Sequence, residues 1–87
     1  MIFRLTNHAL EEIQKRKIPI DIVEYVVQNP QQVLIQEKYI LIYQSQVDLG
    51  TGKIYLLRIF INETVEPAAI VTVYRTSQIK KYWNTLE

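Results

Sequence analysis

The chain has 87 residues and a formal net charge of +1, and 48% of its residues are hydrophobic. A chain of this length holds one hydrophobic core, so we expect a single domain over residues 1–87. Cysteine is absent and histidine occurs once, which excludes disulfide scaffolds, thiolate nucleophiles and cysteine-based zinc sites, and we expect neither a metal nor a cofactor.

Two helices are predicted in the first third of the chain. A cap at Thr6 or Asn7 begins the first helix, which we expect to run to about Lys17. Its apolar stripe at helical spacing consists of Ala9, Leu10 and Ile13. Pro19 suits the first turn of a second helix, which ends before Asn29-Pro30. The buried face of that helix is predicted to contain Ile22, Val23, Val26 and Val27.

After Pro30 the pattern changes to β-branched and aromatic residues, which are typical of strands. Strands are predicted over residues 33–36, 39–47, 53–62 and 68–75. Glu37-Lys38 is a candidate two-residue turn, and Asp48–Gly52 is a clearer one because Gly50 and Gly52 can adopt positive φ. The strand 53–62 is apolar on both faces, so we expect a central strand.

The two ends of the chain add shorter candidates. Phe3–Leu5 is a candidate for a short edge strand, and Thr76-Ser77 offers a cap for a last helix. The apolar residues of that helix are Ile79, Tyr82, Trp83 and Leu86. We therefore predict an α+β domain with two N-terminal helices, an antiparallel sheet of three to four strands and a short C-terminal helix. The helices are expected to lie on one face of the sheet.

Apolar runs are short throughout the chain. The longest fall far short of the roughly 20 residues that cross a bilayer. The first residues lack the long apolar core of a signal peptide. We therefore expect no contact with a membrane and a cytoplasmic location.

Charge is distributed unevenly along the chain. Residues 1–18 and residues 74–87 each have a net charge of +2, whereas residues 19–73 have −3. If the two ends meet in space, they form a basic patch that can hold a phosphate backbone. Ordinary solvated charge explains the same numbers, and both interpretations stay open.

His8 is the one side chain whose unperturbed pKa lies near neutrality, so it is the candidate general acid or base. His8, Glu12 and Arg16 follow one another at i, i+4 spacing and form a polar row beside the apolar stripe. A carboxylate beside the imidazole would favour its protonated form and fix its orientation. In the alternative interpretation His8 packs or caps locally, while Glu12 and Arg16 form a surface ion pair.

Arg58 interrupts a strand that is otherwise apolar on both faces. Such a position tolerates a charge only if the charge is paired or faces a water-filled groove. A ligand groove and an ion pair with Glu63, Glu66 or another acid therefore both stay open. Tyr74 lies at the end of the last strand, where it can contact RNA or pack in the core. Basic residues follow it at Arg75, Lys80 and Lys81.

Several short segments together resemble one known family. Leu5-Thr6-Asn7-His8-Ala9, then Arg16-Lys17-Ile18 and the strand Thr72-Val73-Tyr74, resemble a widespread bacterial family of small proteins of unknown function. Its usual form is a strand, Thr-x-His-Ala, two arginines, Gly-Ile, a second helix and a curved antiparallel sheet that closes on Thr-Val-Tyr. That family is similar in architecture to the BrnT toxins and, more distantly, to the RelE/ParE superfamily. The resemblance covers nearly the whole chain and implies a RelE-like domain.

The resemblance also implies roles for individual residues. By position, His8 corresponds to the family's histidine and Arg16 to its second arginine, whereas Glu12 stands where the first arginine is usual. Lys17 stands where glycine is usual. Arg58 and Tyr74 lie at strand positions where such toxins often place phosphate-handling groups.

The leading hypothesis is a toxin-type RNA-binding protein that acts as a metal-independent endoribonuclease of a type II toxin–antitoxin pair. Its expected partners are RNA and an antitoxin protein. The catalytic residues would be His8 as acid or base, Tyr74 as second proton carrier and Arg58 as the cation at the phosphate. The RNA-binding residues would be Arg16, Arg75, Lys80 and Lys81.

A hypothesis from another class is a non-catalytic protein–protein interaction module. The near-neutral charge and the tyrosine-rich strands 39–47 and 53–62 favour it, because such strands can present an aromatic surface. DNA binding is the weakest hypothesis, since no helix has a basic and polar face for the major groove.

Overall fold

The computed structural model describes residues 1–85, which form one five-stranded sheet and three helices. In chain order these elements are β1 (Phe3–Leu5), α1 (Asn7–Lys15), α2 (Ile20–Gln28), β2 (Gln32–Glu37), β3 (Ile40–Asp48), β4 (Ile54–Asn62), β5 (Ala68–Thr76) and α3 (Ile79–Tyr82). The α+β class is therefore confirmed. None of the helices in this part of the chain is long and apolar enough to span a bilayer.

The sheet has five strands in the order β1-β5-β4-β3-β2, and it is mixed. β1 runs parallel to β5, while the other neighbours are antiparallel. The prediction of a purely antiparallel sheet of three to four strands is thus wrong. The candidate edge strand Phe3–Leu5 is real, so the order of elements begins with a strand and not with a helix. β4 lies in the middle of the sheet, as predicted.

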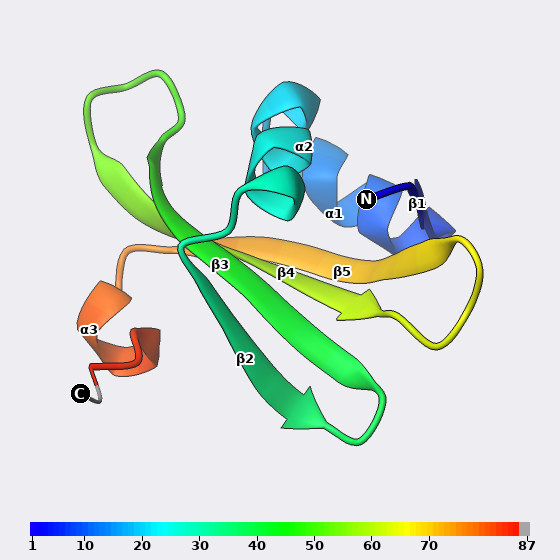
Figure 1. The fold of residues 1–87 in the computed structure, drawn as a ribbon. Coiled ribbons are helices and arrows are strands. Elements are labelled where there is room, and N and C mark those ends of the chain that lie inside the picture. The colour runs from blue at the N-terminus through cyan, green and yellow to red at the C-terminus, as the bar shows by residue number, and fades with distance from the viewer. Residues whose placement is uncertain (86–87) are drawn as a thin grey trace.

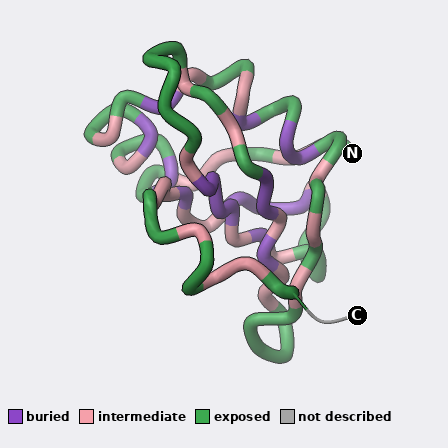
Figure 2. The backbone as a smooth tube through the Cα atoms, turned by 90° about the vertical axis from the view of Figure 1, so that its left-hand side faces the viewer, coloured by how far each residue is buried: buried purple, intermediate pink, exposed green. Residues whose placement is uncertain are grey.

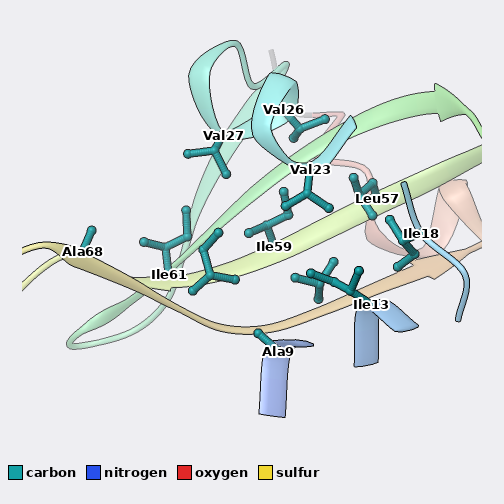
Figure 3. Packing of buried hydrophobic residues seen from close by; sticks show 12 residues of the cluster. Ala9, Ile13, Ile18, Val23, Val26, Val27, Leu57, Ile59, Ile61 and Ala68 are labelled. Atoms are coloured by element: carbon teal, nitrogen blue, oxygen red, sulfur yellow. The ribbon is translucent and has the colours of Figure 1, made fainter. Parts of the chain in front are cut away.

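The hydrophobic core lies between the sheet and the pair α1 and α2, which cover one of its faces (Figure 1). The helical layer contributes Ala9, Ile13, Ile18, Val23, Val26 and Val27. The sheet contributes Leu57, Ile59, Ile61, Ala68, Ile70 and Val73. These side chains interdigitate across the layer in Figure 3. Figure 2 shows the buried residues gathered along the strands and the inner sides of these helices.

The predicted buried faces of the two helices hold with one exception each. Leu10 is 39% exposed, so the buried stripe of α1 contains Ala9 and Ile13 without it. Ile22 is only half-buried on α2, whose buried residues are the three predicted valines. Thr6 is the cap of α1, because its Oγ1 accepts a hydrogen bond from the Ala9 backbone N–H at 3.1 Å.

One of the two predicted turns forms where its glycines indicate, and the other is shifted by one residue. Gly50 and Gly52 have φ of 107° and 85°, as the predicted turn requires. A carboxylate oxygen of Asp48 accepts hydrogen bonds from the backbone N–H groups of both glycines, which lowers the pKa of Asp48. The β2–β3 turn lies at Lys38-Tyr39, one residue later than predicted, because a bulge between Ile35 and Glu37 shifts the register.

The C-terminal helix differs most from the prediction. α3 has four residues, and it lies apart from α1 and α2 (Figure 1). Tyr82 of α3 contacts Arg58, whose side chain points away from the core, so α3 lies on the other face of the sheet. Its N-cap is Gln78, which makes no side-chain capping bond, so the predicted cap at Thr76-Ser77 is wrong. The predicted contribution of Leu86 lies outside the described residues.

Candidate functional site

Arg58 lies at the centre of the sheet, on the face remote from α1 and α2, which we call the distal face. The strand register pairs Arg58 with Gln44 of β3 and with Tyr74 of β5. Because side chains alternate along a strand, these three side chains share the distal face, while their neighbours Leu57 and Val73 enter the core. One polar row therefore crosses three strands.

The guanidinium of Arg58 is buried, with 7% of the residue exposed, and neutral groups bind it. Its Nε donates to Oε1 of Gln44 at 2.9 Å, and Nη1 donates to the Tyr74 hydroxyl at 2.7 Å. Within residues 1–85 no carboxylate lies within ion-pair distance of it. Of the two interpretations that the sequence left open, the ion pair with Glu63, Glu66 or another acid is therefore not found among these residues.

Glu63 has a different partner on the core side of the sheet. Its carboxylate accepts a hydrogen bond from the hydroxyl of Tyr43. Burial and this hydrogen bond raise the pKa of Tyr43 to about 12. Glu63, the acid nearest to Arg58 in the sequence, therefore binds Tyr43 and not Arg58.

Three aromatic rings surround the guanidinium and form what we call the aromatic cluster. The Arg58 Cζ atom lies 4.4 Å from the ring centroid of Tyr82, 5.6 Å from that of Phe60 and 5.8 Å from that of Tyr74. The rings also contact one another, with centroids 6.0 Å apart for Phe60 and Tyr74 and 6.4 Å apart for Tyr74 and Tyr82. Cation–π contacts stabilise a buried guanidinium, but they leave its charge in place.

Two glutamine side chains connect Arg58 to the C-terminal segment. Gln44 is fully buried, and its Nε2 donates to Oε1 of Gln32 at 2.8 Å and to the Tyr82 carbonyl at 3.2 Å. Nε2 of Gln32 donates to the Asn84 carbonyl at 2.7 Å, and its Oε1 accepts from the Asn84 N–H at 3.1 Å. The segment after β5 is therefore attached to the distal face by side-chain amides.

Arg16 reaches the same site from the end of α1. Its Cζ atom lies 6.0 Å from the ring centroid of Tyr74, on which Arg58 also packs. Nε of Arg16 donates to a carboxylate oxygen of Glu12 at 2.7 Å, so the predicted ion pair of these two residues forms. This hydrogen bond and the nearby positive charges of Arg16, Lys15 and His8 lower the pKa of Glu12.

His8 is exposed on the first turn of α1. It lies one helical turn from Glu12 and two turns from Arg16, so it continues the predicted polar row. The contacts among residues 1–85 do not join His8 to Arg58 or Tyr74. His8 is therefore not among the side chains that contact the candidate site in the described residues.

The remaining basic residues are divided between the two faces of the sheet. Arg75 lies on the core-side face, with its Cζ atom 4.7 Å from the ring centroid of Tyr55. Lys80 and Lys81 are exposed on α3, and Nζ of Lys81 lies 5.3 Å from the ring centroid of Tyr82. Lys81 thus adjoins the aromatic cluster, whereas Arg75 does not contact it.

Sequence reasoning identified Arg58 and Tyr74 but missed four residues of the site. These are Gln32, Gln44, Phe60 and Tyr82. A signal for Gln44 exists in the clear turn at Asp48–Gly52, because the register of a hairpin follows from its turn. Pairing Asp48 with Ile54 places Gln44 opposite Arg58. The contact of Tyr82 with Arg58 has no such local signal.

Comparison with known protein families identifies a matching domain model. The family model for a domain of unknown function (DUF4258) matches residues 5–75, a range that includes Arg16, Arg58 and Tyr74 and ends before α3. Neither the curated proteins nor the solved structures contain a significant match to the chain.

Proposed function

The chain belongs to the DUF4258 family, a domain of unknown function, and we propose from the site itself that it is a toxin-type protein that binds RNA on its distal face. One observation carries the proposal: a buried guanidinium that no carboxylate within residues 1–85 pairs with, surrounded by three aromatic rings. Burying an unpaired charge is costly, so a site that keeps one favours an anionic ligand. A phosphate group suits the planar donors of arginine.

The aromatic cluster supports RNA over a small inorganic anion. Unpaired bases stack on tyrosine and phenylalanine rings and on guanidinium planes, and the sheet itself offers the rings of Phe60 and Tyr74 beside the guanidinium of Arg58. Glu12 forms an ion pair with Arg16, whereas no carboxylate within residues 1–85 forms one with Arg58. Lys80 and Lys81 add charge at the rim, where a backbone can follow.

We propose further that bound RNA is cleaved without a metal. The ribose 2′-oxygen would attack the adjacent phosphorus and the bond to the 5′-oxygen would break, leaving a 2′,3′-cyclic phosphate. A base must remove the 2′-hydroxyl proton, an acid must protonate the departing 5′-oxygen, and a cation must stabilise the phosphorane. Arg58 suits the last role, because no carboxylate within residues 1–85 neutralises its charge, and the Tyr74 hydroxyl lies 2.7 Å from its Nη1. Tyr74 is the proton carrier that this geometry supports, whereas His8 contacts neither residue and its role in cleavage is a separate hypothesis with its own test.

The binding step is tested with a fluorescently labelled single-stranded RNA and fluorescence anisotropy. Arg58→Gln should weaken binding by about tenfold or more, and it should reduce the salt dependence by roughly one phosphate contact, a slope change of about 0.7. Lys38→Gln is the matched control, because it removes one positive charge at the exposed tip of the β2–β3 hairpin. Its binding should change less than about twofold.

A further variant distinguishes the loss of the positive charge from a loss of folding. Arg58→Lys keeps the cation at the site and should bind between the wild type and Arg58→Gln. Circular dichroism and thermal unfolding check that each variant is folded. No RNA binding by the wild type, or an unchanged salt slope in folded Arg58→Gln, contradicts the proposal.

A second candidate function is binding of a protein partner, such as an antitoxin. β2 is an edge strand, and its residues Val33 and Ile35 are 48% and 81% exposed. Exposed apolar side chains beside free backbone groups favour pairing with a strand of another protein. Salt separates the two functions, because an apolar interface keeps its affinity at high salt whereas RNA binding weakens steeply.

A further inference from the structure

We infer that Arg58 receives one unpaired nucleobase of the RNA on its guanidinium plane, and that residues 78–85 occupy this position in the free protein. The inference rests on the proposed RNA-binding function and specifies the ligand of the site. In the described structure the ring of Tyr82 lies over the guanidinium of Arg58 at 4.4 Å, the shortest of the three cation–ring distances. A stacked base would need the same place.

The amide groups around Tyr82 have the pattern that a base edge requires. Gln32 binds the Asn84 backbone through one donor and one acceptor, at 2.7 and 3.1 Å. Gln44 donates to the Tyr82 carbonyl at 3.2 Å. A carboxamide that presents a donor beside an acceptor can pair in the same way with the edge of a nucleobase. The C-terminal segment therefore resembles a bound nucleotide in both stacking and hydrogen bonding.

Residues 78–85 are held to the sheet by few interactions, so RNA can displace them. α3 has four residues, none of them buried, and its N-cap lacks a side-chain hydrogen bond. A helix of this length is not stable alone, so its position depends on the contacts with Arg58, Gln32 and Gln44. Arg58 is 7% exposed, so RNA can reach it only if this cover moves.

Two consequences follow for the ligand. A base in a duplex is stacked on both sides and its pairing edge is occupied, so the site selects single-stranded RNA. The C-terminal segment competes with RNA, so the apparent affinity is reduced by the fraction of molecules in which the site is free.

The test compares Tyr82→Ala with Tyr82→Phe in binding of the same labelled single-stranded RNA. Removing the ring should free the guanidinium and tighten binding by about tenfold, the range set by one cation–π contact. Tyr82→Phe keeps the ring, and the Tyr82 hydroxyl makes no hydrogen bond among the described residues, so its affinity should match the wild type. A duplex of the same sequence should not compete for either protein.

A second measurement uses the single tryptophan of the chain, Trp83, which is half-buried beside Tyr82. RNA added to the wild type should shift Trp83 emission to longer wavelength with the midpoint of binding, because the segment moves into water. Unchanged emission together with equal or weaker binding by Tyr82→Ala would overturn the inference and leave RNA binding intact. Absence of RNA binding by the wild type and by both variants would instead overturn the proposed function.

Discussion

The buried position of Arg58 in the middle of the sheet lowers the stability of the folded protein. Transfer of a guanidinium from water into a buried position is unfavourable, and no carboxylate within residues 1–85 compensates it. Gln44, Tyr74 and the aromatic cluster satisfy its donors and cover its plane without neutralising it. An aliphatic side chain at this place in β4 would avoid that desolvation, so the geometry favours a ligand for the charge over a structural role.

His8 allows binding and cleavage to be separated at the level of one residue. Because His8 is exposed and makes no hydrogen bond in the described structure, His8→Ala should leave the fold unchanged. If His8 transfers a proton in RNA cleavage, the variant should lose about 100-fold or more of the cleavage rate. The measurement is cleavage of a defined single-stranded RNA by the purified proteins, resolved on a denaturing gel.

Asn7→Ala is the matched control for His8, since Asn7 is exposed on the same turn of α1. It should cleave at the wild-type rate. A folded His8→Ala protein with full cleavage would remove His8 from the mechanism while leaving Arg58 as an RNA ligand. Growth of a bacterial host after induced expression of the same pair tests the toxin hypothesis, because arrest should require His8.

At the level of elements, the end of α1 explains why a glycine would suit position 17. Lys17 has φ of 55°, in the left-handed region. Its N–H donates to the Gln14 carbonyl at 3.2 Å, and the Ile18 N–H donates to the Ile13 carbonyl at 2.9 Å. This hydrogen-bond pattern is a Schellman motif, and the contact between its two isoleucines seals the helix end in the core.

Lys17→Gly should therefore stabilise the protein by about 1 kcal/mol relative to Lys17→Ala, because glycine removes the strain of a Cβ atom at positive φ. Alanine is the matched comparison, since it also removes the charge and the long side chain. Urea denaturation followed by circular dichroism gives the free energies of unfolding. Equal stability of the two variants would show that the left-handed residue is unstrained.

The elements also show what sequence can and cannot predict here. α1 and α2 have periodic apolar patterns, and their buried faces were predicted with one exception each. The four longer strands were predicted from their β-branched and aromatic residues. β1 has three residues and α3 has four, which is too short for a repeating apolar pattern. Their positions depend on contacts with residues that are distant in the sequence. β1 is parallel to β5, and α3 is attached to β2 and β3 through glutamine side chains.

The residues of the candidate site likewise include some that the sequence predicts and some that only the tertiary structure shows. Arg58 could be identified from the strand alone, because a charge in an apolar strand is unusual. Its neighbours Gln44 and Tyr74 depend on strand register, and the contact with Tyr82 depends on how the chain returns across the distal face. Local sequence therefore predicts the residue that needs a partner, and only tertiary structure shows which partners surround it.

In the whole molecule, the two faces of the sheet differ in what they bury. The face under α1 and α2 holds the connected core, while the distal face holds Arg58 and its polar neighbours. A domain of this size has a small margin of stability, about 5–15 kcal/mol at most. Stability should therefore depend steeply on residues of the core-side face and weakly on exposed positions of the sheet.

The same substitution at two isoleucines tests this difference in stability between buried and exposed positions of the sheet. Ile59 of β4 is fully buried in the core, whereas Ile35 of the edge strand β2 is 81% exposed. Ile59→Ala should lower the free energy of unfolding by about 2–5 kcal/mol, because it removes buried methyl groups and leaves a cavity. Ile35→Ala should change it by less than about 0.5 kcal/mol. Urea denaturation of both variants gives the comparison, and similar losses would contradict the prediction, because they would mean that Ile35 is buried in solution.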